Sequence, residues 1–257
     1  MVVVLVGITW RGGVGWLGAV WAWARSWRLK THWDRGLALF IGANLLLAFT
    51  WSLAPPTRFD ALTYHLVGPK LWVDAGRFIS LPGNHFFGFP QTVQHLYAAQ
   101  MALLAGRMNG AATLHAFYGL LMLVAVGGFA VRRFGAQPAL LTVAFLLSVT
   151  SLWLQMTWPY VDLAPVAFAA VSFIALDQWR TAERARQARW LVLAGVMAGL
   201  VMSVKYTTVT WGVMGGLYIL IYGWRQGLPR VVGPSSTLCC GGFAGGAALV
   251  AAHLGLL

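Results

Sequence analysis

Residues 108–131, MNGAATLHAFYGLLMLVAVGGFAV, contain no Asp, Glu, Lys or Arg side chain. A transmembrane helix needs about 20 predominantly apolar residues to cross the hydrocarbon core of a bilayer, and this run is long enough. Charged residues make up only 9% of the chain and hydrophobic residues 59%, whereas a soluble domain has roughly 25% charged residues. The sequence therefore predicts an all-α fold, a polytopic transmembrane helical bundle.

Apolar runs of similar length recur along the chain, so we predict about eight spans in a single transmembrane domain. Besides residues 108–131 they lie near residues 1–24, 37–54, 138–157, 163–179, 190–207, 208–224 and 232–254. The run at 91–106 is shorter and carries three glutamines and a histidine, which favours an interfacial or re-entrant helix. Residues 55–106 then form one long outer loop with interfacial helices. The chain ends directly after an apolar run, as we expect of the N-terminal, catalytic part of a longer protein.

The formal net charge of +12 is distributed between the apolar runs rather than concentrated in one of them, which argues against nucleic-acid binding. Lysine and arginine gather in the cytoplasmic loops of membrane proteins. If residues 37–54 run outward, twelve of the 18 basic residues fall in inner loops: Arg25, Arg28, Lys30, Arg35, Arg132, Arg133, Arg180, Arg184, Arg186, Arg189, Arg225 and Arg230. This orientation places the loop at 55–106 outside.

Acidic residues number only six, and in this topology Asp60 and Asp162 both fall at the outer surface. Ionisable groups at a membrane edge are costly and by default indicate function. Asp60 begins a segment of helical spacing, residues 60–76, which we predict to be one amphipathic helix along the membrane surface. An acid in that position could instead only cap the helix and complement its dipole.

Lys205 approaches the same outer surface. It lies 15 residues beyond Trp190, which corresponds to roughly 22 Å along a helix in a hydrocarbon core of about 30 Å. A lysine at this depth could either bind an anionic ligand or only extend its amine to the interface.

Three segments, in this order, carry a family resemblance: RFDALTYHLVGPK at residues 58–70, YVDLA at 160–164, and the run at 190–200 followed by KYT at 205–207. They resemble the first outer loop, the second outer loop and a lysine-ended span of bacterial membrane glycosyltransferases of the C superfamily. These include polyprenyl-phosphate-dependent enzymes related to protein O-mannosyltransferases and to lipid A aminoarabinose transferases. The chain departs from the pattern at Gln94, where the resemblance leads us to expect an acid.

The resemblance implies transfer of a hexosyl or pentosyl group from a polyprenyl-phosphate donor to a glycan, lipid or protein acceptor. Such a reaction takes place at the extracytoplasmic surface of the inner (plasma) membrane. It needs a base for the acceptor hydroxyl and cations for the departing lipid phosphate. Asp60 matches the catalytic acid of the family.

Several further residues are candidates for binding the substrate or the lipid phosphate: Lys205, Asp162, Tyr64, His65, Lys70, Arg58, Tyr160 and His85. No cofactor is certain from the sequence. A divalent metal held by Asp60, Asp162 and His65 is an alternative left open, although their spacing matches no recognised metal signature.

Two other functions fit the composition. A membrane transporter would use Asp60, Asp162 and Lys205 as a substrate or proton pathway. Such groups are expected near the bilayer midplane, often in repeated halves, and the sequence shows no internal repeat. A truncated, non-catalytic membrane subunit is the second alternative, because a genuine truncation would leave the enzyme inactive. The clustering of charged groups at one predicted surface favours the glycosyltransferase.

Overall fold

The structure is a computed structural model that describes residues 29–81 and 83–225. Within these residues every regular element is a helix and there is no strand, which confirms the all-α prediction. The elements are α2 (His32–Ser52), η1 (Ala61–His65), α3 (Val67–Ala75), η2 (His85–Gly88), α4 (Thr92–Leu103), α5 (Ala111–Phe134), α6 (Ala136–Ser148), α7 (Thr150–Thr157), α8 (Leu163–Thr181), α9 (Arg184–Met202), η3 (Tyr206–Thr208) and α10 (Val209–Arg225).

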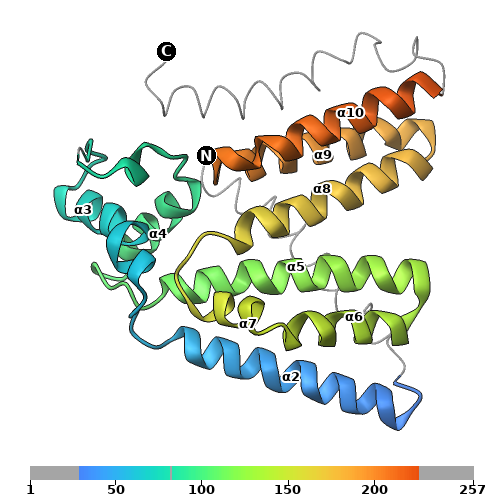
Figure 1. The fold of residues 1–257 in the computed structure, drawn as a ribbon, viewed down its shortest axis with the longest axis horizontal. Helices are drawn as coiled ribbons and strands as arrows, with labels where there is room; N and C mark the ends of the chain where they lie inside the picture. Colours follow the sequence, from blue (N-terminus) through green and yellow to red (C-terminus); the bar gives the residue numbers. More distant parts are fainter. Residues whose placement is uncertain (1–28, 82, 226–257) are drawn as a thin grey trace, which may run out of the picture.

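The long helices lie side by side, and α3 and α4 gather with their connecting segments at one end of the bundle (Figure 1). The opposite end holds the start of α2, the α5–α6 connection and the α8–α9 connection. Within the described residues, most of the inner-loop arginines predicted from the sequence lie in the helix ends that flank these connections: Arg132, Arg133, Arg180, Arg184, Arg186 and Arg189. We therefore call this the inner end, and we call the end with α3 and α4 the outer end.

Helices α2 and α5 are long and apolar enough to cross a membrane, and α6 with α7 adds a third crossing if this bent pair is one span. Every predicted span within the described residues overlaps a helix or, at 138–157, this helix pair, but the span predicted at 190–207 is helical in α9 only to Met202 and then passes through extended backbone at Lys205 into η3. Length and composition thus support two or three of the eight predicted spans. The predicted spans at 1–24 and 232–254 lie outside the described residues.

The predicted span at 138–157 is not one continuous helix, because α6 and α7 meet at an angle of 72°. Val149 between them has an extended backbone with ψ of 105°. The Ser148 hydroxyl donates to the Phe145 carbonyl, and bonds of this kind compete with the regular helical ladder.

The predicted single helix over residues 60–76 is also wrong in detail. It begins with the π-helical turn η1, which is closed by the Leu66 N–H bonding to the Ala61 carbonyl at 3.0 Å. Helix α3 follows and ends at Gly76, whose positive φ of 65° suits a residue without Cβ. Single π-helical turns are frequent at functional sites.

Helix α4 has 12 residues. At 1.5 Å per residue this is roughly 18 Å, well short of the core of about 30 Å. The length agrees with the prediction that residues 91–106 do not cross the membrane.

A close helix contact sets the position of the segment between α7 and α8. A Cβ added to Gly119 of α5 would lie 2.7 Å from Met156 Cγ and 3.1 Å from Leu163 Cδ1. Real side chains do not approach this closely, so glycine is needed for α5 to pack against the end of α7 and the start of α8. This packing fixes Asp162, which directly precedes α8.

Candidate functional site

An ion pair joins two predicted site residues that lie 43 positions apart in the second half of the chain. The Lys205 Nζ donates to Asp162 Oδ1. Asp162 directly precedes α8, and Lys205 lies in extended backbone between α9 and η3. About a third of each side chain is exposed. Lys205 therefore has a carboxylate partner at the outer end and does not merely extend into the interface.

His115 of α5 fixes the loop that carries Asp162. Its fully buried ring donates from Nδ1 to the carbonyls of Gln155 and Trp158, at 2.9 and 2.8 Å, and accepts the Leu163 N–H at Nε2, at 3.0 Å. One donor and one acceptor are what a neutral imidazole provides. The Asp162 side chain makes no hydrogen bond that caps α8 and pairs with Lys205 instead.

A cavity of about 210 Å³ lies beside this ion pair. We call it the outer cavity. Its lining comes from η1, η2, α4 and η3 and from the segments before α8 and after α9, and it includes Tyr64, His65, Phe86, Phe89, Gln94 and Lys205. Tyr64 stacks on Phe86 with their ring centroids 4.1 Å apart. The outer cavity thus has aromatic walls, a lysine at one side and a few polar groups, as ligand sites commonly do.

His65 and Gln94 form a neutral polar pair in this lining. Gln94 Nε2 lies 3.3 Å from His65 Nδ1, and both side chains are buried. Burial lowers the pKa of His65 to about 3; the nearby Asp162 opposes this shift and Lys205 adds to it. His65 is therefore uncharged at neutral pH.

Gln94 Oε1 is buried and has no hydrogen-bond partner among the described residues. If the amide were turned over, its NH₂ group would be left without a partner instead. A buried amide group that lacks a partner costs free energy unless a ligand or water satisfies it. The lining of the outer cavity, which also includes Lys205, thus contains one residue with a buried polar atom that has no partner among the described residues.

Asp60 lies at the start of η1, and its side chain makes no capping hydrogen bond to that turn. Burial raises the pKa of Tyr64 to about 12, with contributions from the charge of Asp60, a hydrogen bond with Asp60 and the charge of Asp162. Burial also raises the pKa of Tyr160, and both carboxylates add to that shift. The charges of Asp60 and Asp162 thus both raise the pKa of Tyr64 and of Tyr160 at the outer end.

Two contacts join the first outer segment to the loop before α8. The Arg58 guanidinium lies over the Trp158 ring, 4.1 Å from its centroid. The Tyr97 hydroxyl of α4 donates to the Tyr160 carbonyl. Arg58 and Tyr160 therefore hold the outer end together, and neither is among the residues that line the outer cavity.

Lys70 and His85 are not among the residues that line the outer cavity. Lys70 pairs with Asp74 one turn further along α3, where both side chains are partly exposed. His85 is exposed in η2 and packs against Phe86, with ring centroids 4.0 Å apart. Residues four positions apart on a helix are neighbours, so the position of Asp74 on α3 is enough to explain its ion pair with Lys70. The structure thus brings Lys205, Tyr64 and His65 into the cavity lining, with Asp162 paired at its side.

The metal alternative finds no support in this arrangement. The described part of the chain has no group of three or more His, Cys, Asp or Glu side chains that could hold a metal ion. Asp162 is paired with Lys205, and His65 faces Gln94. Asp60, Asp162 and His65 therefore do not converge as ligands.

The sequence did not reveal the parts played by Gln94 and His115. A histidine within an apolar span was the available signal for His115. For Gln94 the signal was its place where the family resemblance leads us to expect an acid. Phe86 and Phe89 could be interpreted from the sequence either as interfacial aromatic residues or as the border of a groove for a polyprenyl chain.

Comparison with protein-family models matches residues 90–240 to the family described as dolichyl-phosphate-mannose-protein mannosyltransferase. The match covers more than half of the 257 residues. The chain belongs to this family. It is therefore a member of a membrane glycosyltransferase family of the C-superfamily type, whose reaction uses a polyprenyl-phosphate-linked sugar. No curated protein and no solved structure gave a significant match.

The family match includes Gln94, Asp162 and Lys205 and begins after Asp60, Tyr64 and His65. Two of the three segments in which we saw the resemblance therefore lie within the match. The likeness of residues 58–70 to a first outer loop stays a prediction. The finer likeness to a bacterial subtype is not resolved by this match.

Proposed function

We propose that this protein transfers a sugar from a polyprenyl-phosphate donor to an acceptor hydroxyl, with the reaction at the outer cavity. One observation carries the proposal: a lysine paired with a carboxylate borders an aromatic cavity, in a chain whose family uses lipid-phosphate-linked sugars. The sugar and the acceptor class are not specified by these residues.

Lys205 would bind the phosphate of the donor. An ammonium group has three donors, and the pair with Asp162 uses one of them. When the bond between the sugar C1 and the phosphate oxygen breaks, negative charge increases on the departing polyprenyl phosphate. A cation already held in place by Asp162 stabilises that charge without first having to be oriented.

Asp60 would act as the base. In this role its carboxylate takes the proton of the acceptor hydroxyl while the acceptor oxygen bonds to C1 of the sugar. Tyr64 keeps its proton at neutral pH, as an ordinary tyrosine does, and its pKa is raised further to about 12. Its hydroxyl can therefore donate to Asp60 or to a substrate oxygen, which supports a positioning role for Tyr64.

We further propose an inner-membrane location with the outer cavity facing the outside or the periplasm. The basic residues at the opposite end support this orientation, because such residues mark cytoplasmic loops. The transporter alternative has less support, because Asp162 and Lys205 lie at helix ends rather than within a helix. No structural observation favours the non-catalytic subunit.

The test compares Asp60→Asn with Asp74→Asn in the full chain, reconstituted in lipid nanodiscs. Wild-type protein should release free polyprenyl phosphate from at least one of a set of polyprenyl-phosphate mannose, glucose and arabinose donors when lipid, glycan and peptide acceptors are present. Loss of a general base typically slows a reaction by about a hundredfold to ten-thousandfold, so Asp60→Asn should do so.

Asp74→Asn is the matched control, since this acid of the same loop pairs with Lys70 on the surface of α3. It should leave the rate unchanged. Near-normal turnover by Asp60→Asn would remove Asp60 from the base role. Failure of the wild-type protein to cleave any donor in the set would contradict the proposed function itself.

A further inference from the structure

The inner half of the bundle holds a second and larger cavity. It has a volume of about 350 Å³ and lies between α8 and α10. We call it the inner cleft. Five side chains make it largely apolar: Phe173, Leu176, Trp211, Met214 and Tyr218. Its size falls at the lower end of the range for small-molecule sites, and none of its residues belongs to the outer cavity.

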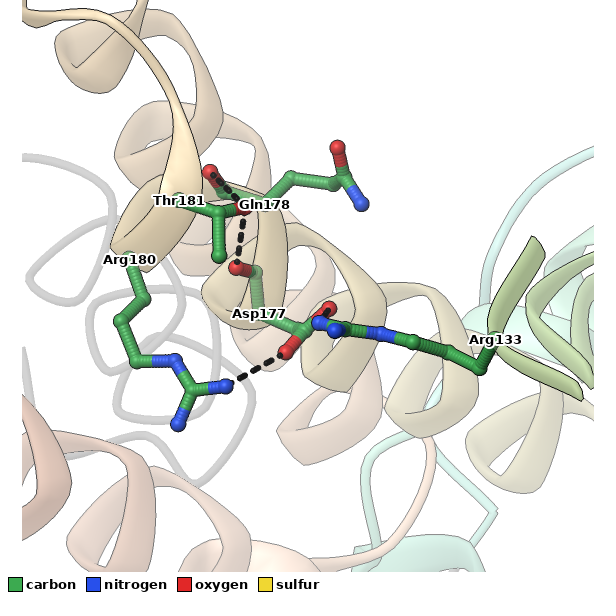
Figure 2. A network of polar contacts seen from close by, with 5 residues as sticks. All are labelled: Arg133, Asp177, Gln178, Arg180 and Thr181. Atoms are coloured by element: carbon green, nitrogen blue, oxygen red, sulfur yellow. Dashed lines mark hydrogen bonds and ion pairs between the residues drawn. The ribbon is translucent and has the colours of Figure 1, made fainter.

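Charged groups lie at one side of this apolar cleft. Asp177 and Arg180 of α8 belong to its lining. Figure 2 shows Arg133 of α5 and Arg180 reaching Asp177 from opposite sides, with contacts of 2.5 and 3.3 Å. The carboxylate is mostly buried, whereas about two fifths of each arginine side chain is exposed. One carboxylate faces two guanidinium groups, so the network has a net positive charge.

Both arginines keep hydrogen-bonding capacity beyond Asp177. A guanidinium has five N–H donors in a planar fork that matches a phosphate group. In each arginine the contact with Asp177 involves a single nitrogen, Nη2. The remaining donors of Arg180 are close to the cleft, because this residue lines it. A phosphate could therefore bind Arg180 without displacing Asp177.

We propose that the inner cleft binds an anionic phospholipid of the inner leaflet. Its phosphate would contact Arg180, and one acyl chain would lie along the apolar groove between α8 and α10. Two observations support this occupant, the net positive charge and the apolar lining, and the orientation proposed above turns the cleft toward the inner leaflet. Basic pockets between transmembrane helices on the cytoplasmic side favour anionic lipids. The proposal does not depend on the glycosyltransferase reaction at the outer cavity.

Gly215 provides a way to block the acyl chain. It lines the cleft, and a Cβ added there would meet only Leu176 Cδ1, at 4.0 Å, which is ordinary contact. A leucine at this position can therefore extend into the groove without forcing the backbones apart. The adjacent Gly216 has no atom within 4 Å of its added Cβ and is not a cleft residue. It is the matched control.

The experiment measures lipid retained by the purified full chain, using native mass spectrometry with phosphatidylglycerol or phosphatidylcholine. The wild-type protein should retain phosphatidylglycerol preferentially. Arg180→Gln should weaken that retention by about tenfold or more, since it removes a charge-assisted bond, and Arg180→Lys should restore part of it. Gly215→Leu should reduce retention of both lipids. Arg186→Gln, in the exposed basic segment of α9, and Gly216→Leu should have little effect.

Two results would overturn the proposal. Equal retention of the two lipids by the wild-type protein would exclude charge selection, and unchanged phosphatidylglycerol binding in Gly215→Leu would show that something else fills the groove. Melting curves identify a variant that fails to fold. If Arg180→Gln fails in this way, a difference between Gly215→Leu and Gly216→Leu still decides the matter.

Discussion

Helix α8 carries one carboxylate near each of its ends, and the two have opposite kinds of surroundings. Asp162, at the outer end, has a single lysine partner and stays about one third exposed. Asp177, at the inner end, is mostly buried between two arginines. The first lies beside a cavity with neutral polar groups, and the second beside an apolar cleft.

The direction of the helix dipole explains part of this difference. A negative charge is favoured at a helix N-terminus and disfavoured near its C-terminus. Asp162 is thus in a favourable place with one cation, and that cation remains available to a second anion. Asp177 is in an unfavourable place, and two arginines from two helices compensate for it. We infer that the outer pair serves ligand binding, whereas the inner carboxylate mainly holds α5 and α8 together.

Among the changes that test this comparison of the two ends of α8, the largest effect should come from replacing the outer cation. Lys205→Met removes the proposed partner of the phosphate, so sugar transfer should fall by about a hundredfold, a typical loss when one electrostatic group is removed from a site. Lys205→Arg should keep part of the activity because the charge remains and the geometry changes. The measurement is the steady-state rate of donor cleavage. Equal rates in the two variants would mean that the charge has no role.

Replacing the two carboxylates near the ends of α8 should affect different properties: Asp177 should matter for stability and Asp162 for sugar transfer. Asp177→Asn should lower the free energy of unfolding by about 2 kcal/mol, less than for a fully buried pair because both arginines are partly exposed. It should leave the rate of transfer per folded molecule unchanged. Asp162→Asn should do the reverse and reduce transfer with little change in melting. Thermal melts and rates of transfer, measured on the same samples, would test this. If both variants lost stability and activity to the same extent, the two carboxylates would not have different roles.

A change of charge within the outer cavity should have a smaller effect. Gln94→Glu keeps the size of the side chain and adds a negative charge to the cavity lining that includes Lys205, where it would disfavour the donor phosphate. We expect the KM for the donor to rise by about tenfold, roughly 1.4 kcal/mol, with a smaller change in kcat. Gln100→Glu on the same helix, outside the cavity lining, is the control. An unchanged KM would show that the phosphate does not approach Gln94.

The smallest effect concerns pH. In the folded protein the pKa of His65 is lowered to about 3, whereas an unfolded chain binds this proton near pH 6.5. The unfolded state then holds more protons below pH 6.5, so stability should fall as the pH drops from 7.5 to 6, by about 0.8 kcal/mol. In His65→Gln this part of the pH dependence should be absent. A wild-type pH profile that matches the variant would contradict a buried neutral His65.

The apolar runs of the sequence were enough to predict the helices at α2 and α5, because length and hydropathy alone distinguish a span. They could not show the bend at Val149, which depends on side-chain bonds and on packing against α5. The positions of Asp162 and Lys205 at one end followed from the order of the spans. Their direct contact, like that of His65 and Gln94, depends on how distant segments pack, and a single sequence does not record such contacts.

The hydrogen bonds of His115 should make local opening of the segment before α8 rare. One buried ring holds two carbonyls and one N–H of this segment, so the segment cannot open one bond at a time at little cost. The amide hydrogen of Leu163 should then exchange with solvent only in the rare openings that also unpack α5, although it lies at the very start of a helix, where fraying normally makes exchange fast.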